Sequence, residues 1–166
     1  MHRRGTSADI RRCLRLARER DLTLRTSIIV GFPGETEEQF RELLDFLEEA
    51  EFDRLGAFAY SAEEDTPAAR MPDQIPEEVK QERLDRLMTL QQGISLRRNQ
   101  RRVGQIEKVL VTDRDDMGNI LGRSQREAPE TDGEILFTDD AVPEAGQFVQ
   151  VKITRAEPYD LMGEMV

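Results

Sequence analysis

Apolar residues near the start of the chain recur at a spacing typical of a helix. Within residues 7–20 they fall at i, i+3, i+4 and i+7, which lines one face with Ile10, Cys13, Leu14 and Ala17. Thr6 is a suitable N-cap, and Asp9 follows three residues later, as in a capping box. We therefore predict a helix packed on one face, with Cys13 in the core as a small hydrophobic residue.

The following elements alternate between strand and helix. Residues 24–30 end in an apolar, β-branched run, which is typical of a buried strand, and residues 54–60 form a second short strand-like segment. Between them, Thr36 and Gln39 match a capping box, and a helical apolar face continues to about residue 51. This order predicts parallel strands of an α/β sheet, joined by right-handed crossovers.

The pattern changes in the second half of the chain. Pro76 suits the first position of a long helix that reaches about residue 102. Beyond Gly104, short apolar segments alternate with turn residues, which predicts strands at 105–112, 120–124, 134–137, 147–155 and 160–166. Five short antiparallel strands predict a small closed barrel of the OB type. We thus expect an α/β part at 1–75, a connecting helix at 76–103 and an all-β barrel at 104–166.

Charge and composition limit the function. The 166 residues include 24 basic and 34 acidic side chains, a net charge of -10, which opposes binding to nucleic-acid phosphates and favours a basic protein partner. Residues 104–166 alone carry 6 basic and 14 acidic side chains, or -8. The single cysteine and the single histidine exclude a disulfide framework and a multi-thiolate or histidine metal site built from this chain alone. No apolar run is long enough to span a bilayer, and the N-terminus lacks a signal peptide's apolar segment, so we expect a cytoplasmic protein with no membrane partner.

The stretch from Gly31 to Thr36 carries the most suggestive chemistry. Its sequence, Gly-Phe-Pro-Gly-Glu-Thr, joins the first strand to the second helix, at the carboxyl edge of a parallel sheet where ligands bind. The glycines let a ligand approach the backbone, and Glu35 can accept hydrogen bonds from a hydroxyl or amine. On these residues alone, a structural turn with Gly34 at positive φ and Glu35 beside the helix dipole remains the favoured alternative.

Several segments resemble the radical S-adenosylmethionine methylthiotransferases. The matching stretches are Met1–Thr6, Leu24–Thr36, Phe58–Ser61 and Thr66–Ala69, while residues 104–166 resemble the family's terminal TRAM domain. Further stretches look most like the branch that acts on a ribosomal protein: 72–80, 122–124, 128–133 and 159–163. The resemblance implies the end of a TIM-like radical barrel, a connecting helix and an OB-like TRAM barrel.

The resemblance also implies a reaction and its cofactors. Such an enzyme uses S-adenosylmethionine and two [4Fe–4S] clusters to add a methylthio group to the β-carbon of an aspartate of small-subunit ribosomal protein twelve. This chain lacks the C-x-x-x-C-x-x-C motif that holds the radical cluster. We therefore expect a C-terminal fragment that is inactive alone, with no catalytic residue and no metal ligand of its own.

Site residues carry over only where the motifs match. The resemblance implies cofactor contacts at Arg3, Gly31, Phe32, Pro33, Gly34, Glu35 and Tyr60. The acidic TRAM domain favours the basic ribosomal protein as its partner and argues against tRNA. Two alternatives stay open: a fragment of a tRNA methylthiotransferase from the same family, and a non-catalytic protein-binding module.

Overall fold

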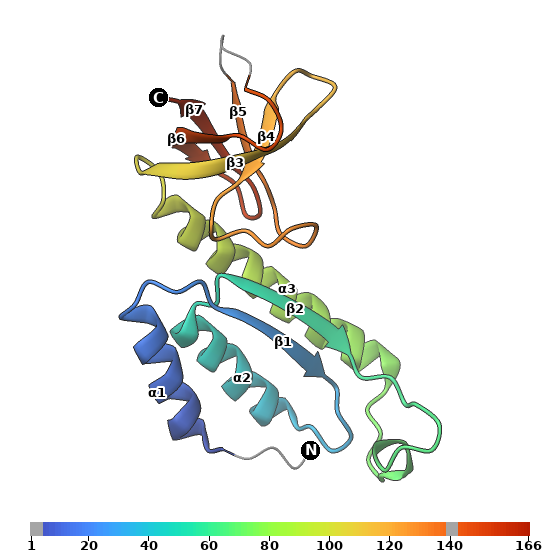
Figure 1. Ribbon diagram of the computed structural model, residues 1–166. Coiled ribbons are helices and arrows are strands. Elements are labelled where there is room, and N and C mark those ends of the chain that lie inside the picture. The colour runs from blue at the N-terminus through green and yellow to red at the C-terminus, as the bar shows by residue number, and fades with distance from the viewer. Residues whose placement is uncertain (1–4, 139–142) are drawn as a thin grey trace. The chain divides into compact units, whose positions relative to one another are not determined.

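The computed structural model describes residues 5–138 and 143–166. The chain divides into two compact units, Met1–Ile94 and Ser95–Val166, and the division falls inside the long helix α3 (Glu77–Gln100). Figure 1 shows an α/β unit built from the N-terminal residues and a barrel built from the C-terminal ones. This is the predicted fold class, α/β followed by an all-β barrel.

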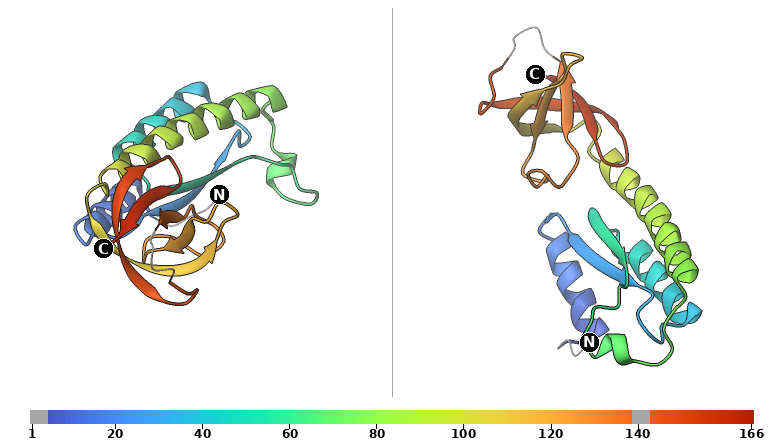
Figure 2. Two further views of the ribbon diagram at one scale, coloured as in Figure 1. Left: turned by 90° about the horizontal axis from the view of Figure 1, so that it is seen from above. Right: turned by 90° about the vertical axis from the view of Figure 1, so that its right-hand side faces the viewer.

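The N-terminal unit is built on two parallel strands. Strand β1 (Arg25–Val30) pairs with β2 (Arg54–Ala59) in continuous register, so that Ile29 lies beside Phe58. Helix α2 (Glu37–Ala50) connects them and runs beside α3 over one face of the sheet (Figure 2). The core between these elements contains five buried side chains: Val30, Phe40, Leu47, Phe52 and Leu87. The strand order and parallel pairing confirm the prediction from the sequence.

Both predicted capping boxes are present. Thr36 accepts a hydrogen bond from the Gln39 N–H, and the Gln39 side chain accepts one from the Thr36 N–H. Helix α1 (Ser7–Arg18) begins in the same way at Thr6 and Asp9. These reciprocal bonds satisfy donors that a helix otherwise leaves unpaired at its first turn.

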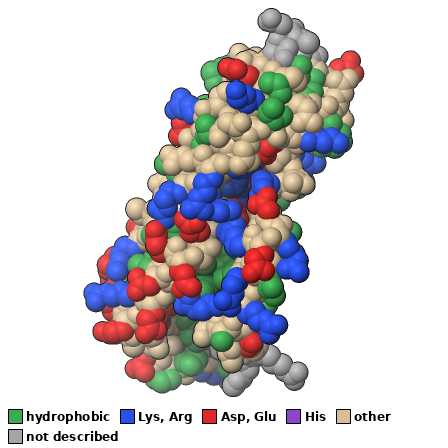
Figure 3. All heavy atoms as spheres, turned by 90° about the vertical axis from the view of Figure 1, so that its left-hand side faces the viewer, with side chains coloured by type: hydrophobic (Ala, Val, Ile, Leu, Met, Phe, Trp, Pro, Cys, Tyr) green, Lys and Arg blue, Asp and Glu red, His purple; other side chains and the backbone are tan. Residues whose placement is uncertain are grey.

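The expectation that Cys13 is buried was wrong. None of the residues of α1 is buried, and Cys13 is exposed. Leu14 packs against the core, and ion pairs from Arg11 to Glu49 and from Arg18 to Asp53 attach the helix to its neighbours. Ala17 is partly buried, whereas Ile10 and Cys13 stay exposed. On the face shown in Figure 3, acidic and basic side chains are mixed over this unit, and apolar side chains are visible between them.

The C-terminal unit is a closed five-stranded barrel in the order β3-β4-β5-β7-β6. Its strands are β3 (Ile106–Arg114), β4 (Ile120–Arg123), β5 (Ile135–Thr138), β6 (Phe148–Ala156) and β7 (Leu161–Met165). Alternate residues point inward, as the alternation in β6 predicted: Val151 and Ile153 are fully buried. Eight buried apolar side chains fill the interior: Val109, Val111, Ile120, Ile135, Phe137, Val151, Ile153 and Leu161.

One pairing in the barrel differs from the prediction. Strands β5 and β7 pair in parallel, whereas all the other neighbours are antiparallel. The reason is topological. In the chain, β6 lies between β5 and β7, but in the sheet β6 pairs with β3 and closes the barrel, which leaves β7 beside β5. Alternating polarity predicts each strand but contains no information on which strands become neighbours.

Candidate functional site

The predicted ligand residues collect at the carboxyl edge of the two-stranded sheet. Gly31–Glu35 directly follows β1 and Tyr60 directly follows β2, and the Tyr60 N–H donates to the Val30 carbonyl at 2.8 Å. The Phe32 and Tyr60 rings meet edge to face, with centroids 5.3 Å apart. We call Gly31–Glu35 and Tyr60 the rim. Arg3, the remaining predicted contact, lies outside the described residues.

Much of the rim backbone is fixed by the protein itself. Gly31 and Gly34 adopt φ of 73° and 80°, in the left-handed region that favours glycine. A Cβ at Gly31 would lie 2.4 Å from Lys80 Cγ, whereas one at Gly34 would meet nothing within 4 Å. The Gly34 N–H donates to the Asp73 carbonyl at 2.9 Å. The structural alternative therefore accounts for both glycines without a ligand.

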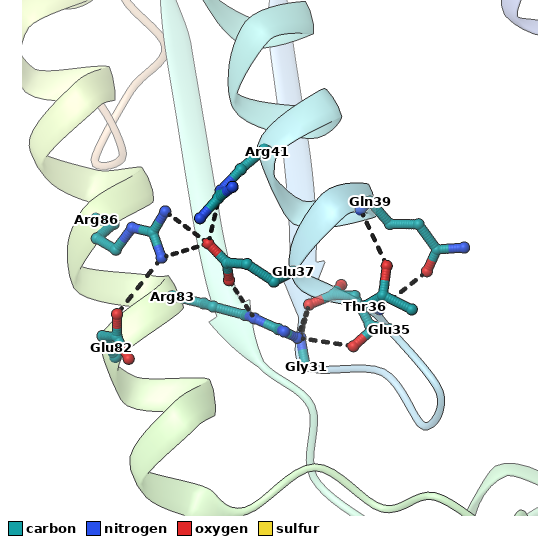
Figure 4. Close-up of polar contacts among 9 residues, drawn as sticks. All are labelled: Gly31, Glu35, Thr36, Glu37, Gln39, Arg41, Glu82, Arg83 and Arg86. Atoms are coloured by element: carbon teal, nitrogen blue, oxygen red, sulfur yellow. Dashed lines mark hydrogen bonds and ion pairs between the residues drawn. The ribbon is translucent and has the colours of Figure 1, made fainter.

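Glu35 is engaged on the inner side of the rim, as Figure 4 shows. Its Oε1 accepts a hydrogen bond from the Gly31 N–H at 2.9 Å and another from Arg83 Nη1 at 2.7 Å. Arg83 Nη1 also donates to the Glu35 carbonyl at 3.1 Å. The Arg83 side chain is 5% exposed and that of Glu35 is 15% exposed, so the ion pair lies largely out of water.

Sequence reasoning missed Arg83, although a signal was present. Arg83 and Lys80 lie on the same helical face as the buried residues Leu87, Gln91 and Ile94, and both are themselves buried. A basic residue on an apolar helical face implies a partner, because an isolated buried charge is costly. The sequence did not indicate that the partner is 48 residues earlier in the chain.

A second carboxylate beside Glu35 extends the charged cluster. Glu37, at the start of α2, accepts hydrogen bonds from Arg86 at 3.1 Å and from Arg41 at 3.1 Å. The hydrogen bond from Arg86, followed by the charges of Arg86 and Arg41, lowers the pKa of Glu37. Glu37 thus stays ionised at the N-terminus of α2, where the helix dipole also favours an anion.

Tyr60 provides the rim's one unsatisfied buried hydroxyl among the described residues. The residue is 9% exposed, and its hydroxyl has no hydrogen-bond partner. Lys80 Nζ lies 5.6 Å from the centre of the Tyr60 ring and is itself paired with Glu77 at 3.0 Å. A buried hydroxyl without a partner is costly, and this one is therefore a suitable hydrogen-bonding group for a bound ligand.

In the C-terminal unit, a buried charged network anchors the segment that enters the barrel. Arg102 donates to both oxygens of Glu107, at 2.8 and 2.7 Å, and to Glu127 at 2.6 Å. Ser124 donates to Glu127 through both its backbone N–H and its hydroxyl. Burial opposes ionisation of Glu127, but the hydrogen bond and charge of Arg102 outweigh it, and the pKa of Glu127 is lowered.

The outer face of the barrel carries a groove of about 540 Å³. Three cations line it, Lys108, Arg123 and Arg126, together with the exposed ring of Phe148. Lys108 Nζ lies 4.4 Å from the centre of that ring. The single carboxylate in the lining, Glu107, is already paired with Arg102. The groove is therefore locally cationic on a domain of net charge -8, an asymmetry that total charge could not predict.

Residues 5–138 and 143–166 contain neither a metal-binding cluster nor a membrane-spanning helix. No group of three or more histidine, cysteine, aspartate or glutamate side chains in these residues is arranged to hold a metal ion. Within the same residues, none of the helices combines the length and hydropathy that a membrane span requires.

Comparison with known proteins gives one consistent result. The chain is 49% identical over its full length to the "Ribosomal protein uS12 methylthiotransferase RimO" of Desulfitobacterium hafniense, and 52% identical to that of Heliobacterium modesticaldum. It is 56% identical over 87% of its length to the RimO of Desulforamulus reducens. The chain spans 38%, 36% and 33% of these three relatives.

The family model for the TRAM domain matches residues 103–166, the segment that forms the closed barrel. The remaining residues, which carry the rim, are covered by the RimO relatives that match the whole chain. The chain is therefore similar, over its whole length, to the C-terminal part of the RimO methylthiotransferases, and its residues 103–166 match the TRAM domain.

Proposed function

We propose that this chain is the C-terminal part of an enzyme that adds a methylthio group to an aspartate of ribosomal protein uS12. The observation that carries the proposal is the identity of about 50% to relatives named for that activity, sustained over the whole chain. A stand-alone binding module would account for the match of residues 103–166 to the TRAM domain but not for the match of the preceding residues to the same relatives.

The rim would contribute to the binding of S-adenosylmethionine. That molecule supplies the radical chemistry, and the protein's task is to bind and orient it. The unpartnered hydroxyl of Tyr60 offers a hydrogen bond, and the Gly31–Gly34 backbone offers close approach. Glu35 accepts hydrogen bonds from Arg83 and from the Gly31 N–H, so within this proposal it fixes the conformation of the rim and does not contact the ligand.

Both [4Fe–4S] clusters would be held by a part of the enzyme outside this chain. The sequence contains one cysteine, and a [4Fe–4S] cluster requires several thiolates. Cys13 is exposed on α1 and not on the rim. We therefore propose that the chain is inactive by itself and contributes cofactor positioning and substrate recognition.

The TRAM barrel would recognise uS12. Its net charge of -8 complements a basic ribosomal protein, and charge complementarity directs encounter and specificity more than it raises affinity. As part of the same proposal, this protein is cytoplasmic and has no membrane partner.

Two measurements test the proposal in sequence. The first is to read the DNA upstream of the Met1 codon, where an open frame continuing into a C-x-x-x-C-x-x-C motif is expected and an in-frame stop would contradict it. The second incubates the longer enzyme without oxygen with S-adenosylmethionine, a sulfide source, reductant and purified uS12. Mass spectrometry should then find a methylthio group in place of one hydrogen on a uS12 aspartate.

The contribution of Tyr60 can be tested in that longer enzyme. Tyr60→Phe removes only the unpartnered hydroxyl, so the variant should fold normally and bind S-adenosylmethionine several-fold more weakly. Tyr159→Phe is the matched control, because it removes a hydroxyl from an exposed tyrosine in the barrel unit. Equal affinities in Tyr60→Phe and the unsubstituted enzyme would remove Tyr60 from the binding site.

The groove on the barrel supports a second candidate, a tRNA methylthiotransferase. Lysine and arginine side chains beside an exposed aromatic ring suit a nucleic-acid strand, which binds through phosphates and base stacking. This candidate predicts salt-sensitive tRNA binding that Lys108→Glu and Arg123→Glu abolish. Binding of uS12 with no detectable tRNA binding, even at low salt, would leave only the first candidate.

A further inference from the structure

One continuous segment, residues 73–83, makes three contacts with the Gly31–Glu35 turn. Asp73 binds the Gly34 N–H, Lys80 occupies the space beside Gly31, and Arg83 binds Glu35. Two of these residues, Lys80 and Arg83, belong to the first turns of α3, and Asp73 precedes that helix by four residues.

Arg83 is the strongest of these contacts because it acts on two parts of the turn at once. One nitrogen, Nη1, reaches both the Glu35 carboxylate and the Glu35 carbonyl, and the same carboxylate oxygen holds the Gly31 N–H. The first and last residues of the turn are therefore linked through a single, partly buried carboxylate. Charge-assisted hydrogen bonds of this kind are short and directional, and they fix geometry as well as adding energy.

The surroundings of Arg83 favour an arginine over a lysine, although its Nε forms no hydrogen bond with the residues that the structure describes. Its Nε lies 3.8 Å from Glu37 Oε2, and its guanidinium lies 5.5 Å from the centre of the Phe40 ring. A planar guanidinium can stack on that ring while directing two nitrogens at two carboxylates. A lysine would keep the charge, but its single nitrogen could not point at the Glu35 and Glu37 carboxylates at the same time.

We propose that Arg83 is a positioning residue for the rim: through Glu35 it sets the conformation of the Gly31–Glu35 turn and, with it, the affinity for S-adenosylmethionine. The proposal rests on the proposed function for the identity of the ligand. It assigns a ligand-directed task to α3, which the sequence indicated only as a connecting helix.

The first test measures the turn directly, in this chain. Amide hydrogen exchange at Gly31 is followed by NMR in the unsubstituted chain and in Arg83→Lys and Glu35→Gln. Exchange at Gly31 should become about tenfold faster in both variants, while exchange at Val151 in the barrel should not change. Arg86→Lys is the control, since Arg86 binds Glu37 and Glu82 and not the turn. Unchanged exchange at Gly31 would overturn the proposal.

The second test separates positioning from simple stabilisation. In the longer enzyme, S-adenosylhomocysteine should bind about tenfold more weakly to Arg83→Lys than to the unsubstituted protein, at a temperature where both are fully folded. The double variant with Glu35→Gln should lose no more affinity than either single variant, because both break the same link. A lower unfolding temperature with unchanged affinity would overturn the proposal and leave Arg83 a structural residue. Failure of the unsubstituted enzyme to bind the ligand would instead refute the proposed function, and Gly31 exchange would still decide whether Arg83 holds the turn.

Discussion

Gly31 and Gly34 share a backbone conformation but differ in their surroundings. Gly34→Ala should cost about 1 kcal/mol, because only the positive φ opposes the new side chain. Gly31→Ala should cost at least about 2 kcal/mol, because its Cβ would also collide with the buried stem of Lys80. Urea unfolding of the two variants measures the difference.

The collision itself can be isolated by shortening the lysine. In a Lys80→Ala background, most of the extra cost of Gly31→Ala over Gly34→Ala should disappear, since the Lys80 Cγ at 2.4 Å is removed and only its Cβ, at 3.2 Å, remains close. If the two Gly31 costs remain equal with and without Lys80, the penalty is due to the backbone alone.

Glu127 makes the stability of the barrel depend on pH. Its pKa is lower in the folded chain than its ordinary value of 4.5, so it stabilises the fold above that pH and loses this contribution as the pH falls through the folded pKa. Glu127→Gln should cost about 2–3 kcal/mol near pH 7, because Arg102 loses one of its two buried carboxylate partners. Urea unfolding at several pH values should show this difference in unfolding free energy narrowing as the pH falls below 4.5 and through the lowered pKa of Glu127. A gap that stays constant with pH would show that the lost contribution is packing and not charge.

At the scale of elements, the two capping boxes differ in their consequences. Thr36→Ala should lower the free energy of unfolding of the N-terminal unit by about 1 kcal/mol, because α2 buries Phe40 and Leu47 and cannot fray without loosening the core. Thr6→Ala removes the same kind of bond from α1, which buries none of its residues, so the loss should stay local. Urea unfolding should detect the first change, and circular dichroism a small loss of helix in both. Equal shifts in unfolding would show that α1 is also part of the cooperative unit.

Elements defined by local rules could be predicted from this sequence. Both caps, the two parallel strands and the five barrel strands follow from neighbouring residues and their periodicity. The parallel β5–β7 pairing could not be predicted, because it is decided by closure of the barrel. Exposure of Cys13 could not be predicted either, since a helical stripe shows which face is apolar and not how much of it a neighbour covers.

In the candidate site, too, features that depend on neighbouring residues could be predicted and contacts between distant residues could not. The position of the rim followed from the strand-to-helix turn, because carboxyl ends of parallel strands share an edge. The Arg83–Glu35 and Arg102–Glu127 pairs join residues 48 and 25 positions apart, and nothing in the local pattern couples them. The net charge of residues 104–166 likewise predicted an acidic barrel, but it could not predict the cationic groove on its surface.

At the scale of the whole molecule, the two units present different surfaces to solvent. Among the described residues, the five barrel strands close on one another, whereas β1 and β2 form a two-stranded sheet. Val30 at the end of β1 is fully buried, but Ile29 is 46% exposed and its neighbour Phe58 is 59% exposed. Exposed apolar side chains on a sheet with open edges favour association with another surface.

We therefore expect the 166-residue chain to self-associate through this sheet. Phe58→Ser should shift the chain toward monomer, as measured by sedimentation velocity over a range of concentrations. Met117→Ser is the matched control. Met117 is 86% exposed in a turn of the barrel, so this substitution removes apolar surface away from the sheet. In the longer enzyme the same Phe58 substitution should not change the oligomeric state if further parallel strands cover the sheet. An equal effect of both substitutions in the 166-residue chain would show that association depends on general hydrophobicity and not on the sheet.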